Sequence, residues 1–158
     1  MKFRLIEPKD NQRLAAIIRQ GIEEFNVPLE GTAHTDPTTD DLYNLFQKKG
    51  SIYWVAEIDG EILGGCGVSP TEGLPEGCAE LVRFFLAPES RGKGIGKFLM
   101  MKCFESAVEL GYRQLYLETF PEMASAVGMY EHMGFQFIPQ ALGNSGHYSC
   151  TIWMLKDL

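Results

Sequence analysis

Apolar residues recur along the chain at two spacings, one typical of strands and the other of helices. Alternating or continuous apolar runs predict seven strands, at residues 2–7, 51–58, 61–68, 78–87, 114–119, 135–139 and 147–155. Apolar residues three and four positions apart predict four helices, which run from residue 8 to about 25, from 38 to about 46, from the turn after residue 90 to about 110, and from 121 to 133.

Residues at the predicted boundaries support this division. Asp59-Gly60 separates two apolar runs and predicts a hairpin, because both central residues of that turn need a positive φ. Thr38 and Asp41 resemble a capping box and are expected to start the second helix. Pro121 suits the first turn of the fourth helix, since proline has no backbone N–H to leave unpaired there.

The run CAELVRFFLA at residues 78–87 is apolar at almost every position. Such a run is typical of a central strand that is buried on both faces. Combined with the order of the other elements, it predicts a mixed α/β architecture, in which helices pack on one central sheet.

Composition and charge narrow the choice of function. A length of 158 residues predicts one domain, spanning residues 1–158. The formal net charge is −7, whereas a protein that binds nucleic acid by electrostatics needs a surplus of Lys and Arg. We therefore expect no nucleic-acid partner, although an open sheet edge would permit a homodimer.

The four cysteines, Cys66, Cys78, Cys103 and Cys150, form no C-x-x-C pair and lie at no metal-ligand spacing with the histidines. We expect no metal site, and we interpret the cysteines as small core residues in a reducing, cytoplasmic setting. No apolar signal region precedes the first predicted strand, and no apolar run is long enough to cross a bilayer. We therefore expect no membrane partner.

The segment RGKGIG at residues 91–96 stands between the buried strand and the third helix. Glycines let a backbone approach a ligand closely, and the first N–H groups of a helix have no partner within the helix. The segment therefore predicts an anion site of the pyrophosphate type, with Arg91 and Lys93 adding positive charge. The alternative is a tight turn that binds nothing. The spacing matches neither a Walker A loop nor G-x-G-x-x-G.

Two blocks resemble the acetyl-CoA signature of the GNAT N-acetyltransferase superfamily. The first is R-x-x-G-x-G at residues 91–96, directly after the strand LVRFFLAP at residues 81–88. The second is AVGMYEHMGF at residues 126–135, which is similar to the family's later helix and its Y-E-x-x-G-F ending. The element order matches the family over nearly the whole chain. One position departs: the family often has Asn seven residues before the tyrosine, where this chain has Met123.

The resemblance implies a GNAT-like fold, with a mostly antiparallel sheet of six to seven strands, about four flanking helices, and fourth and fifth strands that splay apart. It also implies acetyl-CoA as co-substrate. The strand would bind the pantetheine arm and the glycine turn the pyrophosphate. The implied cofactor-binding residues are Phe84, Phe85, Leu86, Arg91, Gly92, Lys93, Gly94, Ile95, Gly96, Lys97 and Tyr130.

Direct acetylation of an amine needs a base, because an alkyl ammonium has a pKa of about 10 and cannot attack while protonated. Glu80 is the first candidate, since it lies on the apolar central strand and matches by spacing a base glutamate of the family. Glu118 is the second, and the alternative for both is an ion pair with Arg83. Tyr130 is the candidate general acid; otherwise it packs in the core. No covalent nucleophile is evident, so direct attack in a ternary complex is expected.

The acceptor is the least constrained part of this interpretation. In the family its binding residues lie mainly in the first two helices, the loop between them and the last two strands, here residues 23–41 and 140–148. The first stretch is acidic, which would suit a cationic amine or merely reflect caps and solvated side chains. The sequence leaves open a small molecule or a peptide as the primary-amine acceptor. A non-catalytic acyl-CoA-binding or sensing domain is the alternative function.

Overall fold

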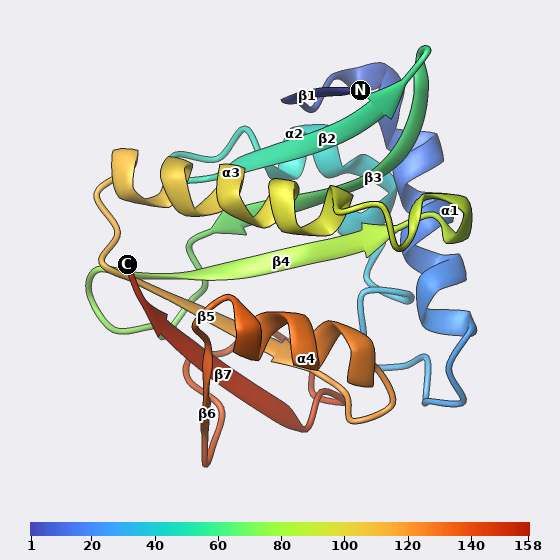
Figure 1. Cartoon of the computed structure of the whole chain (residues 1–158). Coiled ribbons are helices and arrows are strands. Elements are labelled where there is room, and N and C mark those ends of the chain that lie inside the picture. Colours follow the sequence, from blue (N-terminus) through green and yellow to red (C-terminus); the bar gives the residue numbers. More distant parts are fainter.

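The apolar runs of the chain form seven strands, and the computed structural model describes all 158 residues. The strands are β1 (Lys2–Leu5), β2 (Ile52–Ile58), β3 (Glu61–Ser69), β4 (Cys78–Leu86), β5 (Gln114–Thr119), β6 (Gln136–Ile138) and β7 (Ile152–Asp157). They make one sheet in the order β1-β2-β3-β4-β5-β7-β6 (Figure 1). All neighbouring pairs are antiparallel except β4 with β5. The predicted mixed α/β fold is confirmed.

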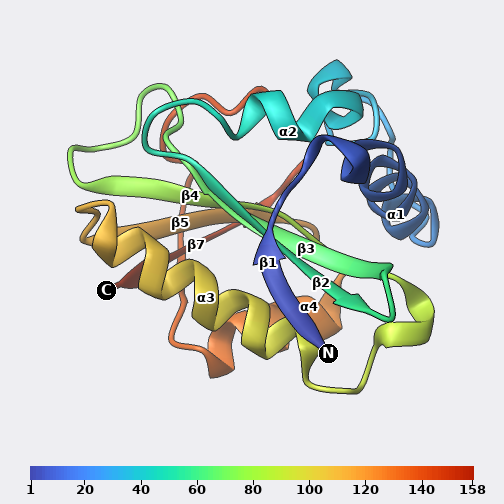
Figure 2. The same ribbon diagram turned by 90° about the horizontal axis from the view of Figure 1, so that it is seen from above.

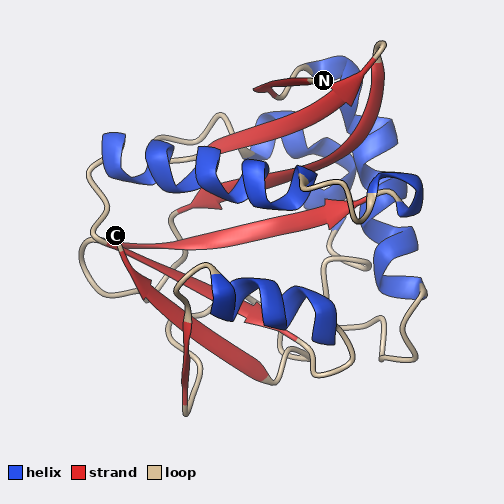
Figure 3. Ribbon diagram, viewed as in Figure 1, coloured by secondary structure: helices blue, strands red, loops and turns tan.

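Four α-helices cover the two faces of the sheet: α1 (Asn11–Glu23), α2 (Leu42–Leu45), α3 (Ile95–Glu109) and α4 (Ala124–His132). Seen from above, α1 and α2 lie on one side of the strands, and α3 and α4 on the other (Figure 2). In Figure 3, α3 and α4 are the helices in front of the strands. Each face therefore has its own apolar core. Leu14, Ile18 and Leu42 belong to one core, whereas Leu99, Cys103 and Val127 belong to the other. No helix is long and apolar enough to cross a bilayer.

The boundaries follow the sequence closely in some places and depart from it in others. Asp59 and Gly60 both have positive φ, at 52° and 80°, which confirms the predicted hairpin between β2 and β3. The helix α4 begins at Ala124 instead of Pro121, and β7 begins at Ile152 instead of residue 147. Residues 147–150 instead form turns beside the loop that follows α1.

The predicted cap at Thr38 is wrong, because the neighbouring aspartates cap instead. Asp36 accepts a hydrogen bond from the backbone N–H of Thr38 at the start of a 3-10 turn, Pro37–Asp41. Asp41 then caps α2 by accepting from the backbone N–H of Asn44. A carboxylate reaches these amides as well as a hydroxyl does, and its charge suits a helix start.

The parallel pair β4 and β5 separates after only three residue pairs, of which Glu80 with Tyr116 is the last. Beyond this point β4 continues to Leu86 beside β3, while β5 continues to Thr119 beside β7. The two strands diverge visibly in Figure 1. This splay leaves the β5-facing edge of β4 without a strand partner, and it opens the centre of the sheet between β4 and α4.

A β-bulge at Arg83 changes which way the side chains of β4 point. Arg83 has a φ of 52°, and the register with β3 shifts at this residue. Before the bulge, Leu81 packs toward α3 and α4 and Val82 toward α1; after it, Phe84 packs toward α3 and α4. A regular strand would send residues 81 and 84 to opposite faces. The bulge therefore places Phe84 on the side of the sheet that carries α4.

The hydroxyl of Tyr53 holds this bulge by donating a hydrogen bond of 2.8 Å to the carbonyl of Arg83. Tyr53 lies on β2, so its ring must cross the intervening strand β3. Gly65 and Gly67 make this crossing feasible, because a Cβ at either position would collide with the ring. The glycine-rich stretch of β3 is thus explained by close packing.

The packing of Tyr53 predicts that Gly67→Ala destabilises the protein. The new Cβ would lie 2.6 Å from Tyr53 Cδ2 and 2.7 Å from Phe46 Cε1, and both rings are buried. We expect the free energy of unfolding to fall by about 1–3 kcal/mol in urea titrations. Gly128→Ala is the control, since that helical glycine has nothing within 4 Å and the change should be stabilising by about 0.5–1 kcal/mol. Equal effects of the two changes would contradict this account.

Candidate active site

A groove of about 430 Å³ runs between the end of β4 and the start of α4. Phe84, Phe85 and Leu86 line it from the strand, as the sequence predicts. Arg91 and Gly92 close one end, and residues 122–126 form the opposite wall. The groove therefore connects the glycine turn with the exposed strand edge, which is the layout needed for a long ligand with an anionic end.

The glycine turn presents six consecutive backbone N–H groups, from residue 92 to residue 97, that have no hydrogen-bond acceptor in the protein. Gly94 is the N-cap of α3 with a φ of 78°, so it contributes no capping side chain. The next residues begin the helix, whose positive dipole end adds to the same site. The predicted free amides are present at the head of α3.

Two residues of the turn have partners that the sequence does not reveal. Arg91 forms a bidentate ion pair with Glu24, with N–O distances of 2.6 and 2.9 Å, and also donates to the carbonyl of Leu86. Its guanidinium therefore lies at the wall of the groove. A Cβ on Gly96 would lie 2.9 Å from Phe84 Cζ, so glycine is needed there for close packing of α3 on β4.

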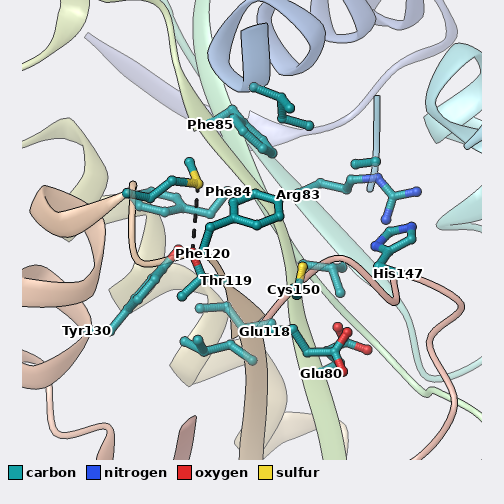
Figure 4. Close-up of a pocket in the computed structure, with 16 residues that line it drawn as sticks. Glu80, Arg83, Phe84, Phe85, Glu118, Thr119, Phe120, Tyr130, His147 and Cys150 are labelled. Carbon is teal, nitrogen blue, oxygen red and sulfur yellow. Dashed lines mark hydrogen bonds between the residues drawn. The ribbon is translucent and has the colours of Figure 1, made fainter. Parts of the chain in front are cut away.

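A smaller chamber of about 70 Å³ continues from the groove into the sheet, where β4 and β5 separate (Figure 4). Phe84, Phe85 and Met123 line both the groove and the chamber. The rest of the wall brings together all three predicted catalytic residues and several others: Glu80, Arg83, Glu118, Thr119, Phe120, Tyr130, His147 and Cys150. The chamber thus joins a mainly apolar entrance to a charged floor.

Glu80 is buried, with 4% of its surface exposed, and it is the last residue of β4 that pairs with β5. Its Oε1 accepts a hydrogen bond of 2.7 Å from the hydroxyl of Thr71. Burial raises the pKa of Glu80 to about 7; the Thr71 hydrogen bond acts to lower this pKa, whereas the charge of Glu118 raises it. Such a carboxyl exchanges its proton near neutral pH, as a general base must.

Glu118 points to the same region from β5, but its oxygens are already engaged (Figure 4). The hydroxyl of Tyr116 donates to Oε2 at 2.6 Å, and the hydroxyl of Ser145 donates to Oε1. Glu118 therefore also holds the loop after β6 in place. Of the two carboxylates, Glu80 has the freer second oxygen.

Tyr130 comes from α4 and lies opposite Glu80 across the chamber (Figure 4). Its ring packs against Phe84 and Phe135, with centroid distances of 5.9 Å to both. Its hydroxyl makes no hydrogen bond within the protein, and burial raises its pKa well above 10. The O–H therefore keeps its proton at neutral pH and is available as a donor.

Beyond the chamber lies a polar cavity of about 240 Å³, lined by Asp36, Thr71, Glu80, Arg83 and His147 among others. Arg83 pairs with Asp36 at 3.2 Å, and not with either glutamate as the alternative interpretation had it. Asp36 also bonds to Nε2 of His147 at 2.8 Å. Burial acts to raise the pKa of Asp36, but hydrogen bonds from Thr38 and His147 and the charge of Arg83 outweigh it, so the pKa falls to about 2.

Comparisons with known proteins agree with this geometry. The acetyltransferase (GNAT) family matches residues 19–135. The uncharacterized N-acetyltransferase YjgM of Escherichia coli K12 is 38% identical over 157 residues, which cover 99% of this chain and 94% of that protein. The chain belongs to the GNAT family of acetyltransferases. It is therefore an enzyme of the acyl-transfer class, and the expected family is confirmed.

Solved structures show the same GNAT fold. A GNAT acetyltransferase from Staphylococcus aureus Mu50 has a TM-score of 0.86 at 21% identity, and the match covers 99% of this chain and 98% of the other. A GNAT phosphinothricin acetyltransferase from Sinorhizobium meliloti, solved with acetyl-CoA, has a TM-score of 0.79 at 22% identity and covers 99% of this chain and 88% of the other. The splayed strands of this acetyltransferase thus follow its fold family.

Some residues of the candidate site of this GNAT enzyme could not be predicted from the sequence alone. Asp36 and His147 are 111 positions apart, and nothing local indicates that they meet. The sequence predicts that Cys150 is a core residue, but it lines the chamber, where burial raises the pKa of its thiol to about 12. Met123 stands at the junction of groove and chamber, and its sulfur accepts a hydrogen bond from the Thr119 hydroxyl at 3.7 Å.

The buried carboxyl of Glu80 predicts a pH-dependent gain in stability for Glu80→Gln. The folded pKa of about 7 exceeds the unfolded value of about 4.3, so wild-type stability falls as pH rises between them. The amide carries no charge and keeps an acceptor for Thr71. At pH 8 we expect the free energy of unfolding to exceed that of wild type by about 2–3 kcal/mol, shrinking toward pH 5. Exposed Glu76→Gln should show no such trend; a gap independent of pH would refute this account.

Proposed function

We propose that this GNAT enzyme transfers an acetyl group from acetyl-CoA to a primary amine by direct attack in a ternary complex. The observation that carries the proposal is the row of six unpaired amides at the head of α3, bordering a groove that leads to Glu80. The N–H groups for an anion, the groove and the candidate base would thus form one continuous site. No predicted role requires a covalent enzyme intermediate.

The residues of the groove fit coenzyme A. The free N–H groups of residues 92–97 would hold the pyrophosphate, with Lys93 and Lys97 adding charge. The unpartnered edge of β4 at Phe84–Leu86 would hold the pantetheine arm by strand-like hydrogen bonds. When bound, acetyl-CoA supplies a thioester whose carbonyl carbon is the electrophile. A main-chain N–H at Phe85 or Leu86 would stabilise the developing oxyanion, worth about 3–4 kcal/mol of barrier.

Glu80 acts as the general base in this mechanism. Its carboxylate takes a proton from the acceptor ammonium, directly or through a water molecule, and leaves a neutral amine that can attack. Glu118 lies beside Glu80 and adds negative charge that favours the incoming cation. Because its oxygens accept from Tyr116 and Ser145, we assign Glu118 to orientation and charge, with Glu80 as the base.

Tyr130 acts as the general acid, because its hydroxyl makes no hydrogen bond within the protein and burial keeps it protonated at neutral pH. The N–C bond forms as the C–S bond breaks, and Tyr130 supplies a proton to the sulfur. The ammonium loses two protons in all, of which one restores Tyr130 and the other leaves to solvent through Glu80. Charge and atoms therefore balance with no further reactant.

The pKa of Glu80 predicts the pH profile of activity. In wild type, kcat/KM should rise with pH through a limb near 7, as Glu80 loses its proton. Glu80→Gln should remove this limb, leave only that of the acceptor amine, and lower kcat by about 10²–10⁴-fold. Tyr130→Phe should lower kcat more than it raises KM. The assay follows release of the CoA thiol, with Glu76→Gln as control. Survival of the limb near 7 in Glu80→Gln would remove the assignment.

The glycine turn predicts where charge matters for coenzyme A. The double change of Lys93 and Lys97 to Gln should weaken CoA binding about 10-fold at low salt, measured by titration calorimetry. The control changes Lys48 and Lys49 to Gln, which removes the same amount of charge far from the glycine turn. These lysines precede Gly50, whose carbonyl accepts a hydrogen bond from Tyr112 beyond the C-terminal end of α3. This control should alter affinity less than about 3-fold. Equal losses in both variants would argue against a local site.

A further inference from the structure

The guanidinium of Arg83 is buried at the junction of the chamber and the polar cavity, with 7% of its side chain exposed. Such burial is costly for a charge unless hydrogen bonds and an opposite charge compensate it. In Figure 4 the side chain extends from β4 toward His147, on the side away from Tyr130. Arg83 is thus the buried cation on the acceptor side of the site.

The hydrogen bonds of Arg83 are incomplete. An arginine has five N–H donors, and here Nη2 uses its donors on Asp36 at 3.2 Å and Thr38 at 3.1 Å. Nε is buried and has no partner, and Nη1 makes no hydrogen bond within the protein. A buried donor without an acceptor is rare and costs about 1–3 kcal/mol. Nε is shielded from the cavity, so Nη1 is the donor that remains for a ligand in the cavity that Arg83 lines.

The charges around Arg83 point to an anionic group as that ligand. Asp36 is the one carboxylate that pairs with Arg83, and it is shared with His147. Glu80 lines the same cavity but does not pair with Arg83, so the two charges lie apart. The cavity thus has the carboxylate of Glu80 at one place and the guanidinium of Arg83 at another, and Glu118 adds negative charge from the adjoining chamber. A small zwitterion would match both charges at once.

We propose that the acceptor is a small amine that also carries a carboxylate, of the α-amino-acid type, with its ammonium at Glu80 and its carboxylate at Arg83. This inference rests on the proposed transfer to an amine and names the class of that amine. Arginine is the side chain best suited to a carboxylate, since its N–H groups form charge-assisted hydrogen bonds.

The loops around the cavity favour a small acceptor over a protein. The backbone N–H of Ser149 donates to the carbonyl of Gly31 at 3.0 Å, and the ring of Tyr148 packs against Gly31. With the bond between His147 and Asp36, these contacts join the segment after β6 to the loop after α1. The cavity of about 240 Å³ is also smaller than the ~300–1,000 Å³ of pockets for drug-sized ligands.

Arg83 could instead serve only to anchor the loop through Asp36 and Thr38, so the test must separate anchoring from recognition. Arg19 offers a matched control, because it ties the same loop by an ion pair with Asp40 and a hydrogen bond to the carbonyl of His34. Arg19 does not line the chamber or the cavity. Loss of anchoring should affect all acceptors alike, whereas loss of recognition should affect only those with a carboxylate.

The experiment compares each of the twenty free amino acids with its carboxamide as acceptor, at saturating acetyl-CoA, by thiol release with hydrolysis subtracted. In wild type we expect kcat/KM for the best acid to exceed that of its amide by about 100-fold. Arg83→Gln should lower the value for the acid by about 100-fold and that for the amide by less than about 3-fold. Arg19→Gln should leave the ratio of acid to amide unchanged.

Other results would overturn the inference in distinguishable ways. If amides, peptides or polyamines are acetylated as well as the acids, or if Arg83→Gln lowers acid and amide equally, the carboxylate is not recognised, while transfer to amines stands. If no amine is acetylated although CoA still raises the melting temperature, the proposed function fails as well. Should Arg83→Gln not fold, Arg83→Lys keeps a charge, and the wild-type ratio of acid to amide decides by itself.

Discussion

The hydrogen bond from Tyr53 to the carbonyl of Arg83 holds the bulge on which the site depends. A non-glycine residue with positive φ is unfavourable by itself, so the surrounding structure must hold it. Because side chains of a strand alternate with a period of two, one extra residue exchanges the faces of everything that follows. The bulge lets Glu80 and Val82 face the polar cavity while Phe84 faces α4 and the groove.

The elements and the glycine turn at one end of the candidate site could be predicted from the sequence, because their signals are local. The hairpin at Asp59-Gly60, the buried run of β4 and the glycine turn before α3 each depend on residues close together in the chain. The bulge could not be predicted, since it needs a tyrosine on β2 and glycines on β3 that act on β4. The contact between Asp36 and His147 could not be predicted for the same reason, because only tertiary packing brings the two loops together.

The site also explains why several polar groups lie where apolar ones would stabilise the fold more. Glu80 and Arg83 are both buried on the same strand without pairing with each other. Burial raises the pKa of Glu80 toward neutrality and leaves N–H groups of Arg83 without protein acceptors. Both features weaken the folded state, and both are useful only if a ligand completes them.

The two ends of the site differ in the groups that would contact a ligand. The glycine turn offers backbone N–H groups, which any sequence that forms the same turn would offer equally. The polar cavity offers side chains from β4, the loop after α1 and the segment after β6. A single substitution in any of these changes what fits, while the fold and the anion site stay as they are. Membership of the family therefore predicts coenzyme A more directly than it predicts the acceptor, and the acceptor must be inferred from Arg83 and Glu80 themselves.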